Sequence, residues 1–190
     1  MENRPDKRGY DQARRLSRRG LLRLTVAGAA ALAAGPALAA KPERRLTLRN
    51  LHTNEMVAVV YWSNGRYQPS ALGKIYDLLR DHRRDEVHPI DPRLLDLLHR
   101  LRLATSARAP FEIISGYRSP QTNAVLRAGS SGVAKRSYHM RGEAVDIRLP
   151  CCGLDHLHRQ ALKLRGGGVG LYRRSQFVHV DVGPVRQWIG

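Results

Sequence analysis

The sequence predicts an α+β protein with a mostly antiparallel sheet and helices packed on one side. Short runs rich in β-branched residues predict strands, and four segments with apolar residues at helical spacing predict helices. The first 39 residues have the character of a leader, and the remaining 151 suffice for one domain with a single core.

The leader is predicted from residues 17–23, Ser-Arg-Arg-Gly-Leu-Leu-Arg, which place a twin arginine ahead of an alanine-rich apolar stretch over residues 24–38. The small residues Ala37-Leu38-Ala39 close this stretch as a cleavage site would. With two glycines and a proline, it falls short of the about 20 strongly apolar residues that a membrane span needs. We expect residues 1–39 to engage the twin-arginine export machinery, with ordinary secretion or an uncleaved anchor as alternatives. Residues 40–190 would then be a periplasmic domain without a membrane span.

The charge of the chain indicates an anionic partner. The net charge is +17, and residues 1–39 hold eight of the 33 Lys and Arg and three of the 16 Asp and Glu, so the exported part keeps about +12. The export signal, and basic residues scattered without interleaved aromatic ones, argue against nucleic acid. An anionic cell wall or membrane surface fits better; charge that serves only solubility is the alternative.

The cysteines predict little chemistry. Cys151 and Cys152 are adjacent, and a disulfide between neighbours would strain both the peptide and the disulfide torsion. We therefore expect no disulfide framework, and an isolated Cys-Cys pair is a weak indication of a metal or redox site.

The first elements of the domain are expected to form a hairpin or meander followed by two helices. Residues 46–51 alternate in polarity, residues 57–62 form a half-buried strand, and Asn64-Gly65 supplies a turn. Residues 69–84 show an apolar helical face. A second helix begins at Asp91-Pro92, a cap followed by proline, and ends near residue 103.

After Pro110 strands and helices alternate. Residues 129–135 form a polar loop that contains glycine, and Ser119-Pro120 opens a helix. The expected strands are residues 111–114, 144–149, 169–172 and 177–182, and the expected helices are residues 119–127 and 154–165.

Two histidines and two aspartates stand close to these strands. Successive strand residues point to opposite faces, so His179 and Asp181 share a face while the valines between and beside them turn to the core. Asp146 projects in the same way from its own strand. Gly142 lets the chain turn between His139 and Asp146, where a side chain could obstruct a metal.

His139, Asp146 and His179 are therefore candidate metal ligands. Two neutral imidazoles and a carboxylate suit Zn²⁺, and three protein ligands leave a coordination position for water, as in catalytic sites. The pattern predicts a hydrolase.

The spacing Ser137-x-His139-x-x-Gly142-x-Ala144-x-Asp146, with Gly116-Tyr-Arg-Ser119 upstream and His179 downstream, resembles the zinc D-Ala-D-Ala peptidases of the Hedgehog/DD-peptidase fold. The similarity is greatest to the YcbK-like murein endopeptidases, the murein endopeptidase K family, and covers essentially all of residues 40–190. It implies one zinc ion per chain held by His139, Asp146 and His179. It also implies Arg118 as a contact to substrate or oxyanion, and peptidoglycan as substrate.

The general base departs from the family pattern. Several relatives place a histidine two residues before the last ligand or a glutamate three before it, and this chain has Phe177 and Gln176 there. Asp181 is our candidate, either as the base or as a carboxylate that orients a ligand imidazole. Glu143 is a further alternative.

Other residues are expected near the site. Ser137 would orient the loop that carries the first ligand, and Tyr117 or Tyr138 would line the substrate groove. Ordinary packing is the alternative for each of them.

The resemblance thus implies a zinc metallopeptidase that hydrolyses cross-links between peptidoglycan stem peptides during cell-wall remodelling, whether of the 3-3 or the 4-3 kind. A carboxypeptidase that trims terminal D-Ala is the close variant. A non-catalytic, zinc-dependent wall-binding domain is the alternative from another class, motivated by the missing base and the positive charge.

Overall fold

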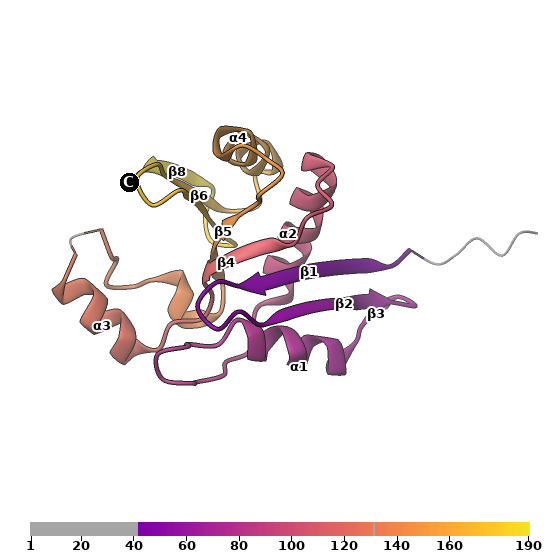
Figure 1. Cartoon of the computed structure of the whole chain (residues 1–190), viewed down its shortest axis with the longest axis horizontal. Helices are drawn as coiled ribbons and strands as arrows, with labels where there is room; N and C mark the ends of the chain where they lie inside the picture. The colour runs from indigo at the N-terminus through magenta and orange to yellow at the C-terminus, as the bar shows by residue number, and fades with distance from the viewer. Residues whose placement is uncertain (1–41, 131) are drawn as a thin grey trace, which may run out of the picture. The chain divides into compact units, whose positions relative to one another are not determined.

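The computed structural model describes residues 42–130 and 132–190, and the leader predicted over residues 1–39 lies outside them. Strands of the described part are β1 (Arg44–Asn50), β2 (Met56–Ser63), β3 (Arg66–Tyr67), β4 (Phe111–Ser115), β5 (Ala144–Arg148), β6 (Gly168–Tyr172), β7 (Phe177–Asp181) and β8 (Arg186–Ile189). They form one sheet in the order β3-β2-β1-β4-β5-β7-β6-β8 (Figure 1).

The class is α+β as predicted, but the sheet is mixed rather than mostly antiparallel. β1 pairs with β4, and β6 with β8, in parallel, while the other neighbouring pairs are antiparallel. Both parallel pairs join strands that are not consecutive in the chain, a connection that no local sequence pattern reveals.

Four α-helices accompany the sheet: α1 (Pro69–Leu78), α2 (Pro92–Thr105), α3 (Pro120–Ala128) and α4 (Leu154–Leu164). Helices α1, α2 and α4 contact the strands, and their buried leucines and isoleucine share one core with the inward residues of the sheet. Helix α3 makes no comparable contact with a strand and lies apart from the other three in Figure 1. None of the helices described is long and apolar enough to cross a membrane.

The local signals that set the ends of these elements act as expected. Asn64 and Gly65 both have positive φ, 52° and 79°, as the two-residue turn between β2 and β3 requires. The Asp91 side chain accepts from the Arg93 N–H at 2.8 Å to cap α2, and Ser119 accepts from the Thr122 N–H at 3.2 Å to cap α3.

Helix α1 ends at Leu78, six residues before the predicted end, because the following segment is held by contacts distant in sequence. The Leu79 carbonyl accepts from the Tyr117 N–H at 2.7 Å. Two residues further on, the Asp81 carboxylate accepts from the N–H and hydroxyl of Ser119 at 2.9 and 2.7 Å. These bonds tie residues 79–81 to residues 117–119, the segment after β4 that contains Arg118.

Two short elements were not predicted. A 3-10 helix, η1 (Tyr138–Arg141), ends at Gly142, whose φ is 67°. A side chain at Gly142 would collide with the chain at Pro89, so packing against this segment, rather than room for a metal, explains the glycine. Strand β8 follows β7 and pairs with β6, although residues 177–182 were expected to be the last strand.

Candidate metal centre

Three buried side chains converge from three elements. His139 comes from η1, Asp146 from β5 and His179 from β7, and Asp146 lies directly opposite His179 in the β5–β7 ladder. His139 Nε2 lies 3.2 Å from His179 Nδ1 and 3.3 Å from Asp146 Oδ1, and His179 Nδ1 lies 2.8 Å from the same oxygen. Ligand atoms around a tetrahedral zinc ion with bonds of about 2.0–2.2 Å lie roughly 3.3 Å apart. The three atoms could therefore hold one metal ion.

The other nitrogen of each imidazole has a partner that fixes its proton. His139 Nδ1 lies 2.7 Å from the Gly116 carbonyl oxygen, which can only accept, so Nδ1 carries the hydrogen. His179 Nε2 lies 3.0 Å from Asp181 Oδ2 and donates to this carboxylate. In this arrangement each ring directs a bare nitrogen toward Asp146. Three acceptors facing one another require a cation between them.

Protonation at this cluster reflects the same demand for positive charge. Burial lowers the pKa of His139. Burial also opposes a charge on His179, but its hydrogen bonds with Asp146 and Asp181 outweigh this and raise the pKa to about 9. Burial alone would raise the pKa of Asp146, and the two imidazoles instead hold it well below its usual range. A raised pKa of His179 means that a metal competes with a proton for this imidazole.

Asp181 lies behind His179 and is fully buried. Its Oδ1 accepts from the N–H groups of Gly168 and Gly183, both at 2.9 Å, and its Oδ2 accepts from His179. Arg186 adds bonds to both oxygens, at 3.1 and 2.6 Å. Burial would raise the pKa of Asp181, but these donors keep it well below its usual range. A carboxylate whose two oxygens accept this many hydrogen bonds is a weak base, and it holds the imidazole that it contacts in a fixed orientation.

The three candidate ligands open into a groove of about 520 Å³. Arg118, Arg136 and Arg186 line it, and Asp146 is the one carboxylate among the lining residues of the described part. The remaining lining residues are Ser130, Gly132, Val133, Ala134, Ser137, Tyr138, His139, Tyr172, Ser175, Phe177, His179 and Trp188. The groove therefore suits an anionic ligand.

Arg118 has capacity to bind such a ligand. Its Nη2 donates to the Ser115 hydroxyl at 3.2 Å and lies 3.8 Å from Asp146 Oδ2, whereas its buried Nε has no partner among the described residues. Burial lowers the pKa of the guanidinium, although Asp146 opposes the shift. The side chain is only 12% exposed, so the site holds a desolvated cation with an unused donor.

Of the other predicted residues, some line the groove and others lie outside it. Ser137 lines the groove, and its carbonyl accepts from the Met140 N–H at 3.1 Å. Tyr117 is not among the lining residues; it stacks on His88 and donates to Glu86 at 2.9 Å. Glu143 also lies outside the groove lining and pairs with Arg141 at 2.9 Å. Cys151 and Cys152 both carry free thiols and belong to no candidate metal group of the described residues.

Sequence reasoning missed the contribution of β8. Arg186 holds Asp181, and the Trp188 ring lies 5.1 Å from the His179 ring, centroid to centroid. The alternation Arg186-Gln-Trp188, which places both side chains on one face of a strand, was the available signal.

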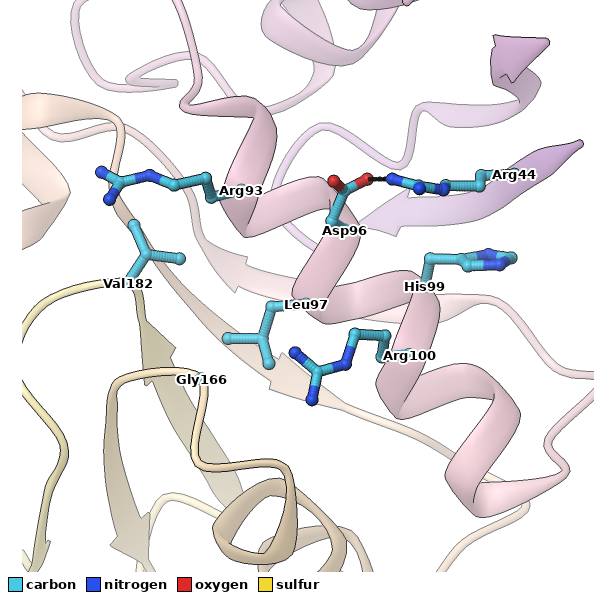
Figure 2. A pocket seen from close by; sticks show the side chains of 8 residues that line it. All are labelled: Arg44, Arg93, Asp96, Leu97, His99, Arg100, Gly166 and Val182. Carbon is cyan, nitrogen blue, oxygen red and sulfur yellow. Dashed lines mark ion pairs between the residues drawn. The ribbon is translucent and has the colours of Figure 1, made fainter. Parts of the chain in front are cut away.

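A second pocket, of about 420 Å³, lies beside α2 and contains no candidate ligand (Figure 2). Arg44, Arg93 and Arg100 line it, and Asp96, its one carboxylate among the described residues, already pairs with Arg44 at 2.6 Å. None of the residues that line this pocket also lines the groove. Within the described part of the chain, the candidate metal ligands lie in the groove and not in this pocket.

Together the fold and the site define an α+β protein with a candidate metal centre open to a groove, which is the design of a metal-dependent hydrolase. The protein-family model described as peptidoglycan L,D-endopeptidase MepK matches residues 38–188. The chain belongs to this family, which confirms the resemblance predicted from its motifs.

Relatives of known name support the assignment. Peptidoglycan L,D-endopeptidase MepK of Escherichia coli (strain K12) is 45% identical over 176 residues, 90% of this chain and 97% of the relative. The probable peptidoglycan L,D-endopeptidase MepK of Haemophilus influenzae is 42% identical over 156 residues, 81% of this chain and 84% of the relative. No solved structure matches the chain.

Proposed function

We propose that the protein is a zinc-dependent endopeptidase that hydrolyses cross-links between peptidoglycan stem peptides. The observation that carries the proposal is the convergence of His139 Nε2, His179 Nδ1 and Asp146 Oδ1 in the lining of a groove that also contains three arginines. The relatives are named as L,D-endopeptidases, and this supports an L,D-peptide bond as the one that is cut.

In this proposal one zinc ion per chain is held by His139, Asp146 and His179. When bound, zinc supplies Lewis acidity, which polarises a carbonyl group and lets water ionise near neutral pH. The choice of zinc rests on the donor set, because two imidazoles and one carboxylate with room for a further ligand match catalytic zinc sites.

The chain's own residues bind the substrate and stabilise charge. Arg118 lines the groove beside Asp146, and its buried Nε has no partner among the described residues, so the guanidinium can hold the developing oxyanion or a substrate carboxylate. Arg136 and Arg186 extend the positive lining of the groove. Stem peptides end in carboxylates, and the groove offers them Arg118 and Arg136, whereas Arg186 pairs with Asp181. Ser137 would keep the loop of His139 in place.

Asp181 fits the role of orienting His179 better than the role of base. Its Oδ2 faces the ring nitrogen on the far side from Asp146, and all its contacts are with donors. It would hold His179 in the tautomer and rotation that present Nδ1 to the metal.

We further propose that residues 1–39 direct the protein to the periplasm through the twin-arginine route, where its substrate lies. The pattern at residues 17–23 supports this route. A protein that acquires its metal while folding gains from export in the folded state.

A non-catalytic, zinc-dependent wall-binding domain is the second candidate. It is favoured by one observation: among the described residues that line the groove, Asp146 is the one carboxylate, so no second carboxylate there can serve as a general base. Such a protein would bind sacculi through its arginines without cutting them.

Purified sacculi separate the two candidates. They would be incubated with the protein, with and without a zinc chelator, and the soluble fragments analysed by mass. We expect fragments with lost cross-links that disappear with chelator and return with added zinc. Protein that sediments with intact sacculi and releases no fragment would contradict the peptidase and support the binding domain.

A further inference from the structure

Strands β7, β6 and β8 are neighbours in the sheet, and each contributes two residues that lie opposite one another across the ladder beside His179. On β7 the pair is His179 and Asp181. On β6, Gly170 lies opposite His179, and on β8 Trp188 lies opposite Gly170. Two residues away in the same ladder, Gly168 of β6 lies opposite Arg186 of β8. Each glycine thus lies between a β7 residue of the site and a long side chain of β8.

The glycines leave the space that these side chains occupy. A Cβ atom on Gly168 would lie 2.6 Å from Asp181 Oδ2 and would collide with the guanidinium of Arg186. A Cβ atom on Gly170 would collide with the indole of Trp188. Because β6 carries no side chain here, Arg186 and Trp188 can reach across it to β7.

Arg186 makes the most specific contact across this gap. Both of its terminal nitrogens bind Asp181, at 3.1 and 2.6 Å, which is the two-pronged geometry that fixes a carboxylate best. Its guanidinium stacks between the rings of Tyr138 and Trp188, at 4.8 and 5.1 Å. The Trp188 indole is held in turn by a 3.0 Å hydrogen bond to the Tyr172 hydroxyl.

We propose that Arg186 is a positioning residue of the metal centre, acting through Asp181 on His179, and that Gly168 and Gly170 are there to let it and Trp188 reach them. The proposal deepens the proposed function and rests on it for the metal. Strand β8, which contributes no ligand, is then part of the centre.

Charge and positioning predict opposite effects for one substitution. Arg186→Gln removes a positive charge near the metal, which by itself would favour binding of a cation. It also frees Asp181, which would loosen His179. If positioning dominates, zinc affinity falls, by about tenfold on the scale known for partners of metal-binding histidines. Arg186→Lys keeps the charge but not the two-pronged contact, so its affinity should fall at least as far.

The test is a zinc titration of the purified protein against a chromophoric chelator. We expect Arg186→Gln to lose about tenfold in affinity in the wild-type background but less than about twofold in an Asp181→Asn background, because a residue that acts through Asp181 has nothing to act on there. Gly168→Ala should reproduce the loss. Gly73→Ala, whose new Cβ meets nothing within 4 Å, is the matched control and should bind zinc as the wild type does.

Three outcomes overturn the positioning role: unchanged affinity in Arg186→Gln, increased affinity in Arg186→Gln, or an equal loss with and without Asp181. Thermal unfolding of the metal-free variants accompanies the titration, so that a general loss of folding is not counted as loosened metal binding. A failure of the proposed function would give a different experimental result from a failure of the positioning role. Wild-type protein that binds zinc but releases no fragment from sacculi would contradict the peptidase and leave the affinity comparison standing.

Discussion

His179 is held at both ring nitrogens, by Asp146 on one side and Asp181 on the other. Because it supplies one of three bonds to a single ion, His179→Ala should lower bound zinc well below one per chain while the fold remains. Elemental analysis of purified protein measures this, with the exposed His156→Ala as control. Full zinc retention in His179→Ala would remove this residue from the ligand set.

A substitution of Asp181 distinguishes its two candidate roles, because each role affects a different measurement. Asp181→Asn places an amide N–H₂ among groups that themselves donate, so it loosens His179. Zinc affinity should then fall by about 10–100-fold, and added zinc should restore much of the activity. If Asp181 were instead the base, activity would fall by roughly 10²–10⁴-fold with zinc affinity nearly unchanged. Parallel measurement of zinc affinity and fragment release from sacculi decides between them.

For these individual residues, the sequence predicted which side chains come together but not the chemical role of each one. Strand alternation placed His179 and Asp181 on one face, and the structure brings His139, Asp146 and His179 together as expected. It could not show that two backbone N–H groups and Arg186 would saturate Asp181, because these donors come from β6, β8 and the turn between β7 and β8. Hydrogen-bond partners across strands depend on register, which spacing along one strand does not reveal.

Among the elements, the segment after α1 is organised by one buried carboxylate. Asp81 is 1% exposed and accepts from Ser119 and from the Arg83 N–H. Burial would raise its pKa, but hydrogen bonds from Thr122 and Ser119 hold it below the usual value of 3.8. A lowered pKa in the folded state contributes stability that is present above pH 3.8 and is lost as the pH falls through the folded value.

Asp81→Asn should therefore destabilise the metal-free protein by about 1–3 kcal/mol at neutral pH, because the amide group faces donors. The deficit should shrink as the pH falls from the unfolded pKa of 3.8 toward the lower folded value, because Asp81 of the unfolded wild type then takes up a proton that the folded state does not. Urea unfolding at pH 7 and pH 3 measures both values. Asp77→Asn, on the exposed side of α1, is the control. An equal deficit at both pH values would mean that the charge of Asp81 contributes nothing.

The same segment explains why element boundaries were predicted unevenly. Helices α2 and α3 begin where Asp91 and Ser119 predicted, because a cap is a local interaction. Helix α1 stops early because Leu79 and Asp81 bond to residues about 38 positions further along the chain. Strand β8 was missed for a related reason: its four residues alternate over too short a stretch to predict a strand by themselves, and pairing with β6 defines them.

For the whole molecule, composition and element order predicted the α+β class but not the directions of all strands. The two parallel pairs bring together strands separated by helices or by another strand, so their direction depends on the path of the chain in space. The positive charge is easier to relate to structure, since arginines line both the groove and the pocket beside α2, and the candidate ligands found among the described residues lie in the groove.

Export is the remaining property of the whole chain, and its test involves only the leader. If Arg18 and Arg19 are read as a pair, changing both to Lys preserves the charge and the apolar stretch while removing what the twin-arginine machinery recognises. Unprocessed precursor should then accumulate in the cytoplasm, as cell fractionation and immunoblotting would show. The neighbouring pair Arg14 and Arg15, changed to Lys in the same way, is the matched control and should leave export intact. Mature protein appearing normally outside the inner membrane in the Arg18 and Arg19 variant would instead favour ordinary secretion, and the metal would then have to be acquired after export.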